Sequence, residues 1–325
     1  MQNHSTTNFE LTFSQWLDIW MNQFMKIKLR PTTYSSYTQL INKHIKPKLG
    51  YIQLQDLSPL AIQECYNSLL LENLSAKTVK NIHVIIHSAL KQAIKCGYIK
   101  QNVSEAVALP KVERPEIKTL SSEQVTTFLQ AAKSDSLYPA FLLELYTGLR
   151  RGELLGLKWD DIDFDNCTIH VKRSLVRVYD HNLKKTTLLL QPPKTKAGYR
   201  VIPIPDFVVA ELKELYEEHQ RIKLSQSNFN SLNLMFVTTQ GTPIDPRNFE
   251  RKFKRLLKKA NLPNIRLHDL RHTVATLLLQ QNVHPKIVQE ILGHRDISTT
   301  LDIYSHVNIE LKKKATSCLV EILNS

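Results

Sequence analysis

Apolar residues recur three and four positions apart along most of the chain, which is the spacing of helices that bury one face. In the stretch FSQWLDIWMNQFM, five large apolar side chains form one such stripe: Phe13, Trp16, Leu17, Trp20 and Phe24. A second helix is predicted from Pro31 to about Lys48. Ser58, which a proline follows, and Ser75 have the positions of N-cap residues for two more helices, the last of which ends before Gly97. The first hundred residues therefore predict a lobe of four helices.

The helical pattern stops in the segment LPKVERPEIK, residues 109–118, which has two prolines, mixed charge and no apolar periodicity. We interpret this segment as an extended linker. It divides the chain into an N-terminal tail over 1–10, a helical domain over 11–108 and a larger domain over 119–325.

The larger domain is predicted to open with helices and then to change character. Ser121 and Gln124 indicate a capping box for a helix that ends near Ala132, and AFLLELYTG predicts the next helix. Between Thr168 and Ile204, the β-branched runs TIHVKRSL, TTLLLQ and YRVIPI predict a small antiparallel sheet, with PPKTKAG as a turn between two of its strands. The helical pattern then returns, with breaks at Pro243, Pro263 and Pro285. The expected fold class is mainly α with a small antiparallel β-sheet.

Charge indicates the kind of partner. The 325 residues carry a formal net charge of +13, of which +5 falls in residues 1–110 and +8 in the remainder. Two basic domains favour a polyanion, because the release of counterions from nucleic acid drives such binding. A solvated basic surface is the alternative.

Cysteine usage and hydropathy exclude several other classes. The four cysteines lie far apart and form no CxxC pair, so neither a disulfide framework nor a cysteine zinc site is predicted for Cys65, Cys96, Cys167 and Cys318. No run of 18 apolar residues occurs, and the N-terminal MQNHSTTNFELTF lacks the pattern of a signal peptide. We expect a cytoplasmic protein with no membrane partner.

The stretch IRLHDLRHTVATLLLQQ, residues 265–281, has the pattern of a buried helix whose first turn carries ionisable groups. At helical spacing, Arg271 falls one turn after His268 and on the same face, whereas Leu270 and Val274 point toward a core. A cation and a hydrogen-bond donor at a helix N-terminus, where free N–H groups favour an anion, are typical of a phosphate site. A capped helix with a surface arginine is the alternative.

A metal site is another interpretation of His268 and His272, which are four residues apart. The zinc protease pattern requires a glutamate directly after the first histidine, but Asp269 occupies that position and no third ligand is evident. We therefore predict no metal and no other cofactor.

Two further stretches carry candidate residues. In YTGLRRGELLGLKW, Arg150 follows Gly148, where a tight turn after a helix would leave the arginine in a cleft, and Glu153 could hold it there. In LGHRDISTTLDIYSHV, His294 follows a Leu-Gly helix end and Tyr304 comes ten residues later. Taken singly, the arginine could be a surface residue with an ion-pair partner, and the tyrosine could pack in a core.

As an ordered set, these motifs resemble those of the tyrosine recombinases, the integrase family of temperate phages and integrative conjugative elements. TGLRRGEL resembles the first arginine box, HDLRHT the second, LGH and TTLDIYSH the motifs that follow, and PPKTKAGYRVIPI the lysine hairpin. The catalytic residues that the resemblance implies are Arg150, Lys194, His268, Arg271, His294 and Tyr304, with Glu153 as a supporting acid and Lys196 as the alternative lysine.

The resemblance implies a two-domain DNA clamp, in which a SAM-like core-binding lobe of four helices precedes an α/β catalytic domain. The implied reaction is site-specific recombination for the integration or excision of a mobile element. Tyr304 would attack a phosphodiester and keep its energy in a 3′-phosphotyrosyl bond, so the strands rejoin without ATP. The arginines would clamp nonbridging oxygens, the histidines would add hydrogen bonds, with His268 also placed to accept the tyrosine proton, and the lysine would protonate the leaving 5′ oxygen.

The implied partners are double-stranded DNA at attachment sites and further copies of the chain in a synaptic tetramer; an excisionase or a host DNA-bending protein are others that this family allows. Two rival functions stay open. One is a type IB topoisomerase that relaxes DNA by nearly the same chemistry, and the other is a DNA-binding regulator that has lost catalysis. The short core-binding lobe and the LGH-to-tyrosine spacing favour the recombinase over the first, and the complete catalytic set favours it over the second.

The two ends of the chain differ in what they add to the resemblance. Many phage integrases have an arm-site-binding domain before the core-binding lobe, whereas about ten residues precede Leu11 here. We expect arm-site binding to be lacking, or the chain to be a shortened form. The segment NIELKKKATSCLVEIL predicts a C-terminal helix over 308–323 whose apolar face packs in its own chain or, as often in this family, on a neighbouring protomer.

Overall fold

The computed structural model describes residues 11–113, 118–180 and 184–306, and of residues 303–306 it describes the backbone alone. The predicted tail over 1–10 and the predicted helix over 308–323 lie outside these ranges. By its internal contacts the chain divides into two compact units, Met1–Pro115 with Val178–Thr187, and Glu116–Arg177 with Leu188–Ser325. The division after Pro115 falls within the segment that we interpret as a linker.

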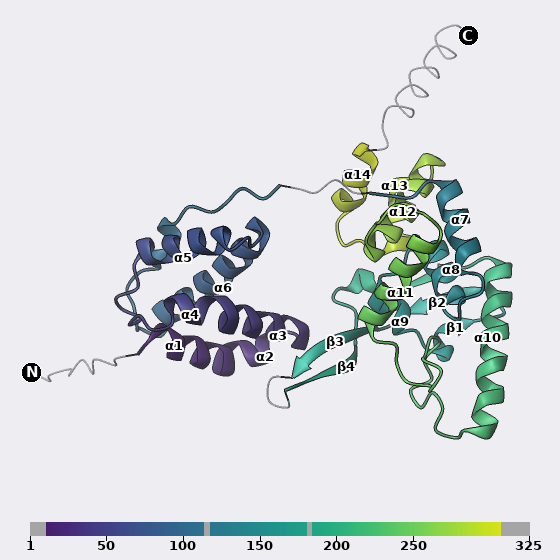
Figure 1. Cartoon of the computed structure of the whole chain (residues 1–325), viewed down its shortest axis with the longest axis horizontal. Coiled ribbons are helices and arrows are strands. Elements are labelled where there is room, and N and C mark those ends of the chain that lie inside the picture. The colour runs from purple at the N-terminus through teal and green to yellow at the C-terminus, as the bar shows by residue number, and fades with distance from the viewer. Residues whose placement is uncertain (1–10, 114–117, 181–183, 307–325) are drawn as a thin grey trace, which may run out of the picture. The chain divides into compact units, whose positions relative to one another are not determined.

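The first unit is built on four helical stretches (Figure 1). Its elements are α1 (Phe13–Ile19), η1 (Trp20–Met25), α2 (Lys26–Lys28), α3 (Pro31–Leu40), η2 (Ile41–Ile45), α4 (Lys46–Leu49), α5 (Pro59–Leu71), α6 (Ala76–Lys95) and η3 (Val103–Ala106). The predicted N-caps are confirmed, because Ser58 accepts a hydrogen bond from the Ala61 N–H and Ser75 accepts one from the Thr78 N–H, both at 3.2 Å. The π-helical turns η1 and η2 lie within the first two stretches, and the helix continues on both sides of each.

The apolar stripe of the first helix is the centre of the first unit's core. Trp16 and Trp20 are fully buried there, and the Trp16 indole N–H donates to the Ala89 carbonyl of α6 at 3.0 Å. This bond satisfies a buried donor that would otherwise cost stability. Of the five residues of the stripe, Phe24 alone is partly buried, and it packs against the edge of the cluster.

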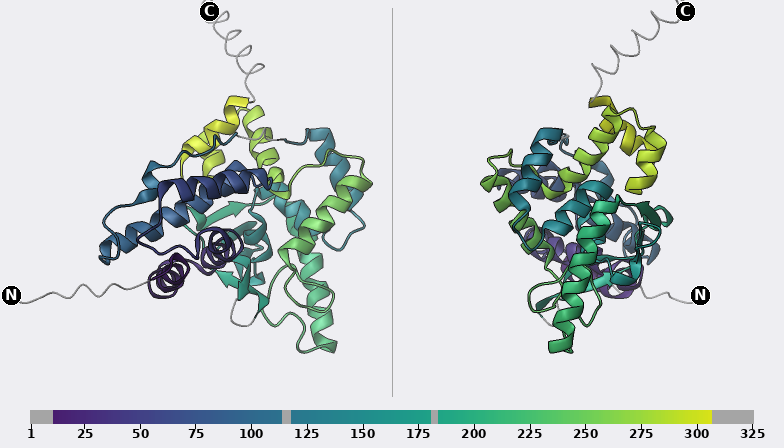
Figure 2. Two further views of the ribbon diagram at one scale, coloured as in Figure 1. Left: turned by 60° about the vertical axis from the view of Figure 1, so that its left-hand side comes forward. Right: turned by 90° about the vertical axis from the view of Figure 1, so that its right-hand side faces the viewer.

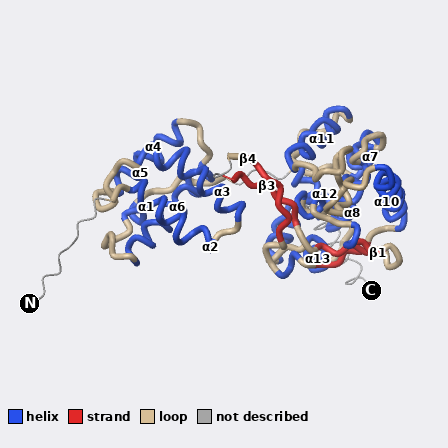
Figure 3. Tube along the Cα trace, turned by 90° about the horizontal axis from the view of Figure 1, so that it is seen from below, coloured by secondary structure: helices blue, strands red, loops and turns tan. Residues whose placement is uncertain are grey.

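The rest of the described chain alternates helices with short strands. Its elements are α7 (Ser122–Ala132), α8 (Tyr138–Thr147), α9 (Arg151–Leu155), η4 (Trp159–Asp161), β1 (Ile162–Asp163), β2 (Thr168–Val171), β3 (Ser174–Asp180), β4 (Lys185–Gln191), η5 (Lys196–Gly198), β5 (Arg200–Pro203), α10 (Asp206–Ser225), α11 (Pro246–Lys259), α12 (Leu267–Gln280), α13 (Pro285–Leu292) and α14 (Ile297–His306). The predicted capping box is present, since Ser121 accepts from the Gln124 N–H and the Gln124 side chain accepts from the Ser121 N–H. Helices therefore dominate, and the five strands of the described residues all lie between 162 and 203 (Figure 3).

The strands form two sheets, and this corrects one detail of the expected fold. An antiparallel sheet has the order β1-β2-β5, and β3 pairs only with β4. The prediction that PPKTKAG lies between two strands is confirmed, because the segment connects β4 to β5. The single sheet is wrong, because these two strands belong to different sheets. Ile202 of β5 lies opposite Ile169 of β2 with both side chains fully buried, whereas the apolar residues of β4 that pack on the core, Leu188 and Leu190, are only partly buried.

Helix α12 is the centre of the C-terminal part of the second unit (Figure 2). It contacts α8, α11, α13 and α14, and α13 also contacts α14. Ala275 and Leu279 of α12 form a small buried cluster with Val288 and Leu292 of α13. This packing fixes the end of α13 against α12. None of the helices in the described part of the chain is long and apolar enough to span a membrane.

Candidate active site

The N-terminal part of α12 carries the most deeply buried charge of the site. Arg266 is the N-cap residue, and its backbone N–H donates to the Asp269 carboxylate at 2.8 Å, which fixes where the helix begins. From that start Leu270 and Val274 are buried in the core, as predicted. Arg271 follows Leu270 and is only 2% exposed.

The Arg271 guanidinium is incompletely paired. Its Nη1 donates to the Gly148 carbonyl at 2.7 Å, but its buried Nη2 has no hydrogen-bond partner among the described residues. Burial, followed by the charge of Arg150, lowers the pKa of Arg271 to about 9, while Glu153 acts in the opposite sense. A buried donor of a charged group without a partner is costly, and it marks a place where an anion would be stabilised.

Arg150 reaches the same place from the turn between α8 and α9. Gly148 ends α8 with φ +59° and ψ 27°, a left-handed conformation that favours glycine, and Arg150 is the N-cap residue of α9. The Arg150 Nη1 donates to Glu153 Oε1 at 2.7 Å, and its Nη2 donates to the Gly293 carbonyl at 3.0 Å. The Arg150 side chain remains 41% exposed, so it is held in place and yet open to solvent.

Glu153 is the buried acid of this corner, with a side chain that is 6% exposed. Besides Nη1 of Arg150, it accepts from the Arg150 backbone N–H at 3.1 Å and from Nη2 of Arg200 at 2.8 Å. Burial raises the pKa of Glu153, but the hydrogen bond and charge of Arg200 and then those of Arg150 outweigh it, so the pKa is lowered. Glu153 is therefore a carboxylate that holds two arginines.

Two histidines complete the cluster. His294 follows Gly293, which ends α13 in the left-handed conformation; it is 7% exposed and its Nδ1 lies 2.9 Å from the Thr300 hydroxyl of α14. Burial, followed by the charges of Arg271 and Arg150, lowers the pKa of His294 to about 3. His268 has an exposed surface, but the protein packed around its ring and then its neighbour His272, whose ring centre is 5.0 Å away, lower its pKa to about 4. Both rings are thus neutral near pH 7 and can donate or accept a hydrogen bond.

The predicted residues differ in how far the structure brings them together. Hydrogen bonds tie Arg150 to Glu153 and to Gly293 beside His294, and the Gly148 carbonyl ties Arg271 to the same turn. Their charges also act on one another, because Arg150 and Arg271 both lower the pKa of His268 and of His294. These residues form one polar corner where two guanidinium groups and two neutral imidazoles surround a place suited to a phosphate.

The predicted lysines lie in the connection from β4 to β5. Lys194 and Lys196 are both exposed, and Lys196 begins the short helix η5. The backbone of η5 packs on the polar corner, because a Cβ at Gly293 would lie 2.7 Å from the Ala197 carbonyl oxygen. The segment that carries both lysines therefore lies against the corner.

Tyr304 lies on α14, one helical turn after Thr300. The Tyr304 side chain lies outside the described residues. The backbone nevertheless places position 304 on the helix that Thr300 ties to His294.

Our reading of the sequence missed three side chains that hold this corner. Arg200 bonds to Glu153, Thr300 is fully buried against His294, and the Gln289 amide donates to the His294 carbonyl at 3.1 Å. For Arg200 a signal existed, because it has the same parity on β5 as the buried Ile202, and an arginine in phase with core positions needs a buried partner.

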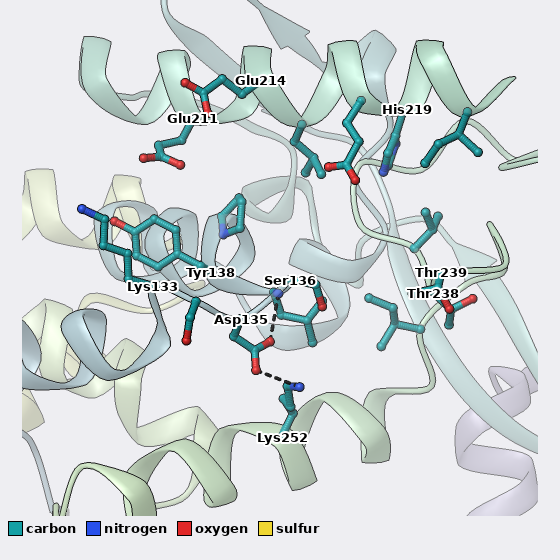
Figure 4. A pocket seen from close by; sticks show the side chains of 18 of the residues that line it. Lys133, Asp135, Ser136, Tyr138, Glu211, Glu214, His219, Thr238, Thr239 and Lys252 are labelled. Atoms are coloured by element: carbon teal, nitrogen blue, oxygen red, sulfur yellow. Dashed lines mark hydrogen bonds and ion pairs between the residues drawn. The ribbon is translucent and has the colours of Figure 1, made fainter. Parts of the chain in front are cut away.

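A separate hollow of about 850 Å³ lies between α10, α11 and the loop before α8, and it is lined by polar residues such as Tyr138, Glu211 and His219 (Figure 4). An Asp135–Lys252 ion pair of 2.7 Å crosses its floor. None of the residues of the polar corner lines it. Among the described residues, no three His, Cys, Asp or Glu side chains come together as a metal site.

Comparison with known sequences gives the family. Residues 118–310 match the phage integrase family, and residues 12–70 match the phage integrase N-terminal SAM-like domain. A XerC-like tyrosine recombinase of Caldanaerobacter subterraneus subsp. tengcongensis is 31% identical over 96% of this chain and 84% of its own. The ICEBs1 integrase of Bacillus subtilis is 28% identical over 92% of this chain and 80% of its own.

Comparison with solved structures gives the same fold. The Tn1549 transposon integrase in complex with circular intermediate DNA has a TM-score of 0.75 and 25% identity, over 95% of this chain and 100% of that one. A lambda integrase in a tetramer bound to a Holliday junction has a TM-score of 0.67 and 22% identity, over 91% of this chain and 78% of that one. The family match covers more than half of the residues, and the chain therefore belongs to the phage integrase family of tyrosine recombinases, enzymes that transfer DNA strands.

Proposed function

We propose that this recombinase cleaves and rejoins DNA at the attachment sites of a mobile element through a 3′-phosphotyrosyl bond to Tyr304. The observation that carries the proposal is the buried, unpaired Nη2 of Arg271 beside Arg150. A guanidinium keeps its charge throughout the reaction and offers planar donors that match two phosphate oxygens. Two of them supply the positive charge that a pentacoordinate phosphorane requires.

The remaining side chains have roles that follow from their protonation. The phenol of a tyrosine has a reference pKa of about 10, so its attack requires proton removal or a strong local field. His268 is neutral and exposed, which suits a group that accepts the tyrosine proton. His294 is buried and neutral, and its bond to Thr300 through Nδ1 leaves Nε2 for a phosphate oxygen.

The leaving 5′ oxygen needs a proton when the strand is cut. Lys194 is our first choice for this general acid and Lys196 the second, since both lie on the exposed segment that packs on the polar corner through η5. To rejoin the strand, the 5′ hydroxyl gives its proton to the lysine and attacks the phosphotyrosyl ester, and Tyr304 leaves and regains its proton. The bond energy stays in the phosphotyrosyl ester between the two steps, so no nucleotide cofactor is needed.

The partners are proposed from the relatives. The Tn1549 integrase was solved with circular intermediate DNA and lambda integrase as a tetramer on a Holliday junction. By analogy, this chain would bind the joined ends of its element and act as a tetramer that exchanges strands in pairs. An excisionase or a host DNA-bending protein would bias the direction. We expect the protein to act in the cytoplasm, where its DNA substrate is located.

The experiment uses duplex DNA that spans the junction of the host element, nicked near the expected cleavage site so that the product cannot be resealed. Wild-type protein should form a covalent complex on a denaturing gel, equally in excess EDTA, and peptide mapping should find the DNA on Tyr304. Tyr304→Phe keeps the ring and removes only the attacking oxygen, so it should bind the same DNA within about twofold and form no complex. A covalent complex from Tyr304→Phe would move the nucleophile elsewhere, and one that needs a divalent ion would favour a metal site.

A supercoiled plasmid that lacks the junction sequence distinguishes site-specific recombination from the DNA relaxation of a topoisomerase. A recombinase should leave its supercoiling unchanged under conditions in which the junction DNA is cut. Relaxation of that plasmid at a similar rate would instead identify a topoisomerase.

A further inference from the structure

Arg200 lies outside the set of residues that the motifs name, yet it is the most fully paired arginine of the polar corner. It begins β5, opposite Val171 of β2, and its side chain is 7% exposed. Each of its nitrogen atoms donates: Nε to the Ile291 carbonyl at 2.7 Å, Nη1 to the Gly198 carbonyl at 3.2 Å, and Nη2 to Glu153 Oε2 at 2.8 Å. The planar fork of an arginine is needed to reach three acceptors in fixed directions.

These acceptors connect elements that carry different catalytic groups. Ile291 is in the last turn of α13, where carbonyl groups lack partners within the helix and favour a cation. Glu153 is in α9 and holds Arg150, and Gly198 is in the lysine segment. Arg200 therefore joins the helix end before His294, the acid behind Arg150 and the segment of Lys194 and Lys196.

The contacts close into a ring. Arg200 bonds to Glu153, Glu153 to Arg150, and Arg150 to the Gly293 carbonyl. Gly293 packs back on Arg200, because a Cβ at position 293 would lie 3.0 Å from Arg200 Cδ. With φ +66° this glycine also has the backbone conformation that turns the chain toward His294. A movement of Arg200 would shift both sides of the ring.

The geometry points to Arg200 as a positioning residue of the recombination reaction, which sets the directions of the Arg150 guanidinium and of the His294 segment without touching DNA. This inference rests on the proposed roles of Arg150 and His294. Each of the three Arg200 nitrogens donates within the protein and the side chain is only 7% exposed, which makes Arg200 a poor candidate for a direct contact with a phosphate oxygen. Its effect on the chemistry is exerted through Glu153 and Gly293.

The test is single-turnover cleavage of the nicked junction DNA by wild-type protein, Arg200→Lys and Arg200→Met, with DNA affinity and melting temperature measured in parallel. Lysine keeps the charge and most of the length but offers one ammonium group in place of three directed N–H groups. For Arg200→Lys we expect a cleavage rate at saturating DNA about 10 to 100 times lower, with half-saturation within about twofold of wild type.

The matched control is Arg177→Lys. Arg177 of β3 also donates to a carboxylate, Asp245, at 3.0 Å, but it bonds to none of the residues of the ring. The Arg177→Lys variant should cleave the nicked junction DNA at the wild-type rate. The comparison isolates the position of the arginine from the general cost of exchanging an arginine in an ion pair.

A pH profile supplies a readout that a purely structural role would not change. The charged groups that face Glu153 are Arg150, Arg200 and Arg271, from α9, β5 and α12. Burial raises the pKa of Glu153, and the bond from Arg200 is the largest effect that lowers it. In Arg200→Met the acid should protonate at higher pH, so the acidic limb of the cleavage rate should move to higher pH, and Glu153→Gln added to this variant should remove that limb.

The outcomes separate this inference from the proposed function. Wild-type protein that forms no covalent complex would overturn the proposed function. A wild-type complex together with a normal rate in Arg200→Lys would overturn only the role of Arg200. The role of Arg200 would also be overturned if the cleavage rates of both Arg200 variants fell only in proportion to lost folded protein and the acidic limb of the pH profile did not move.

Discussion

Arg200 and Arg271 are both buried arginines of the catalytic unit, and their surroundings differ in one respect. Arg200, at the edge of β5, donates from all three nitrogens, and one acceptor is the Glu153 carboxylate. Arg271, in the second turn of α12, donates from Nη1 to one carbonyl, and its Nη2 has no partner within the described residues. Burial and the charge of Arg150 lower the pKa of Arg271 to about 9, in keeping with a charge that is poorly compensated.

The difference separates a side chain that holds the protein together from one that is kept for a ligand. A fully paired buried cation has its desolvation cost offset by its partners, whereas an incompletely paired one destabilises the free protein and gains when an anion arrives. Active sites concentrate such unpaired groups, because transition-state stabilisation needs donors that are already oriented. The same chemical group therefore has opposite consequences at two positions of one site.

The largest expected effect concerns the general acid, which is neither Arg200 nor Arg271. If Lys194 protonates the leaving oxygen, Lys194→Ala should slow cleavage by about 10² to 10⁴, and Lys196→Ala should mainly weaken DNA binding. A substrate with a 5′-bridging sulfur separates the acid from the arginines, because sulfur leaves as a stable anion. The sulfur substrate should restore the cleavage rate of Lys194→Ala, whereas cleavage by Arg271→Met should remain slow. If sulfur restores Lys196→Ala alone, the roles of the two lysines are reversed.

The next effect compares the two arginines in cleavage. Arg271→Met removes a transition-state donor, and single-turnover cleavage of junction DNA should fall by about 10² to 10³. Arg200→Met acts only through other residues, so its loss in rate per folded molecule should be smaller. If Arg200→Met lost more activity per folded molecule than Arg271→Met, the division into holding and binding roles would be wrong.

For the free energy of unfolding we expect the opposite order, with the larger loss in Arg200→Met. Arg200→Met leaves the buried Glu153 without one of its two arginines, and we expect the free energy of unfolding to fall by about 3 to 5 kcal/mol. Arg271→Met replaces a poorly compensated charge by an apolar chain of similar length, and we expect a gain on the order of 1 kcal/mol. Urea denaturation of the DNA-free protein measures both. Equal losses in the two variants would remove the basis of the comparison.

The smallest effect is on the pH dependence of stability. The pKa of His294 in the folded protein, about 3, lies below the ordinary histidine value of about 6.5. Only the unfolded chain therefore binds this proton between these two values, so the stability that the neutral ring provides is present above about pH 6.5 and is lost as the pH falls toward 3. Arg271 is the second cause of the low value, so Arg271→Met should flatten the acid slope of the unfolding free energy. The conservative Arg200→Lys, which retains a charge that is not among those causes, should leave the slope as in wild type.

Local sequence rules predicted much of this arrangement. The N-caps at Ser58 and Ser75, the glycine before Arg150 and the start of α12 all depend on a few neighbouring residues, so a single sequence contains them. The contact of Arg200 with Ile291 joins residues 91 positions apart. Such contacts depend on which sheet β5 enters, and no local pattern carries that information.

The division of the strands into two sheets has the same origin. PPKTKAG was correctly placed between two strands, but those strands were expected in one sheet, since β4 and β5 are neighbours in the chain. They instead pair with β3 and β2. Both β4 and β5 have apolar residues that pack on the core, so their local patterns do not distinguish the two sheets. The π-helical turns η1 and η2 likewise have no signal in the apolar spacing, which continues through them.

The central claim is that the unpaired donor of Arg271 is kept for a nonbridging oxygen of the scissile phosphate. Its most direct test is junction DNA in which that phosphate is a methylphosphonate, so that one charged oxygen is replaced by a methyl group. On ordinary DNA, Arg271→Met should cleave about 10² to 10³ times more slowly than wild type. On methylphosphonate DNA the two proteins should differ by less than about tenfold, because the charge that the arginine compensates is gone. An equal deficit of Arg271→Met on both substrates would contradict the claim.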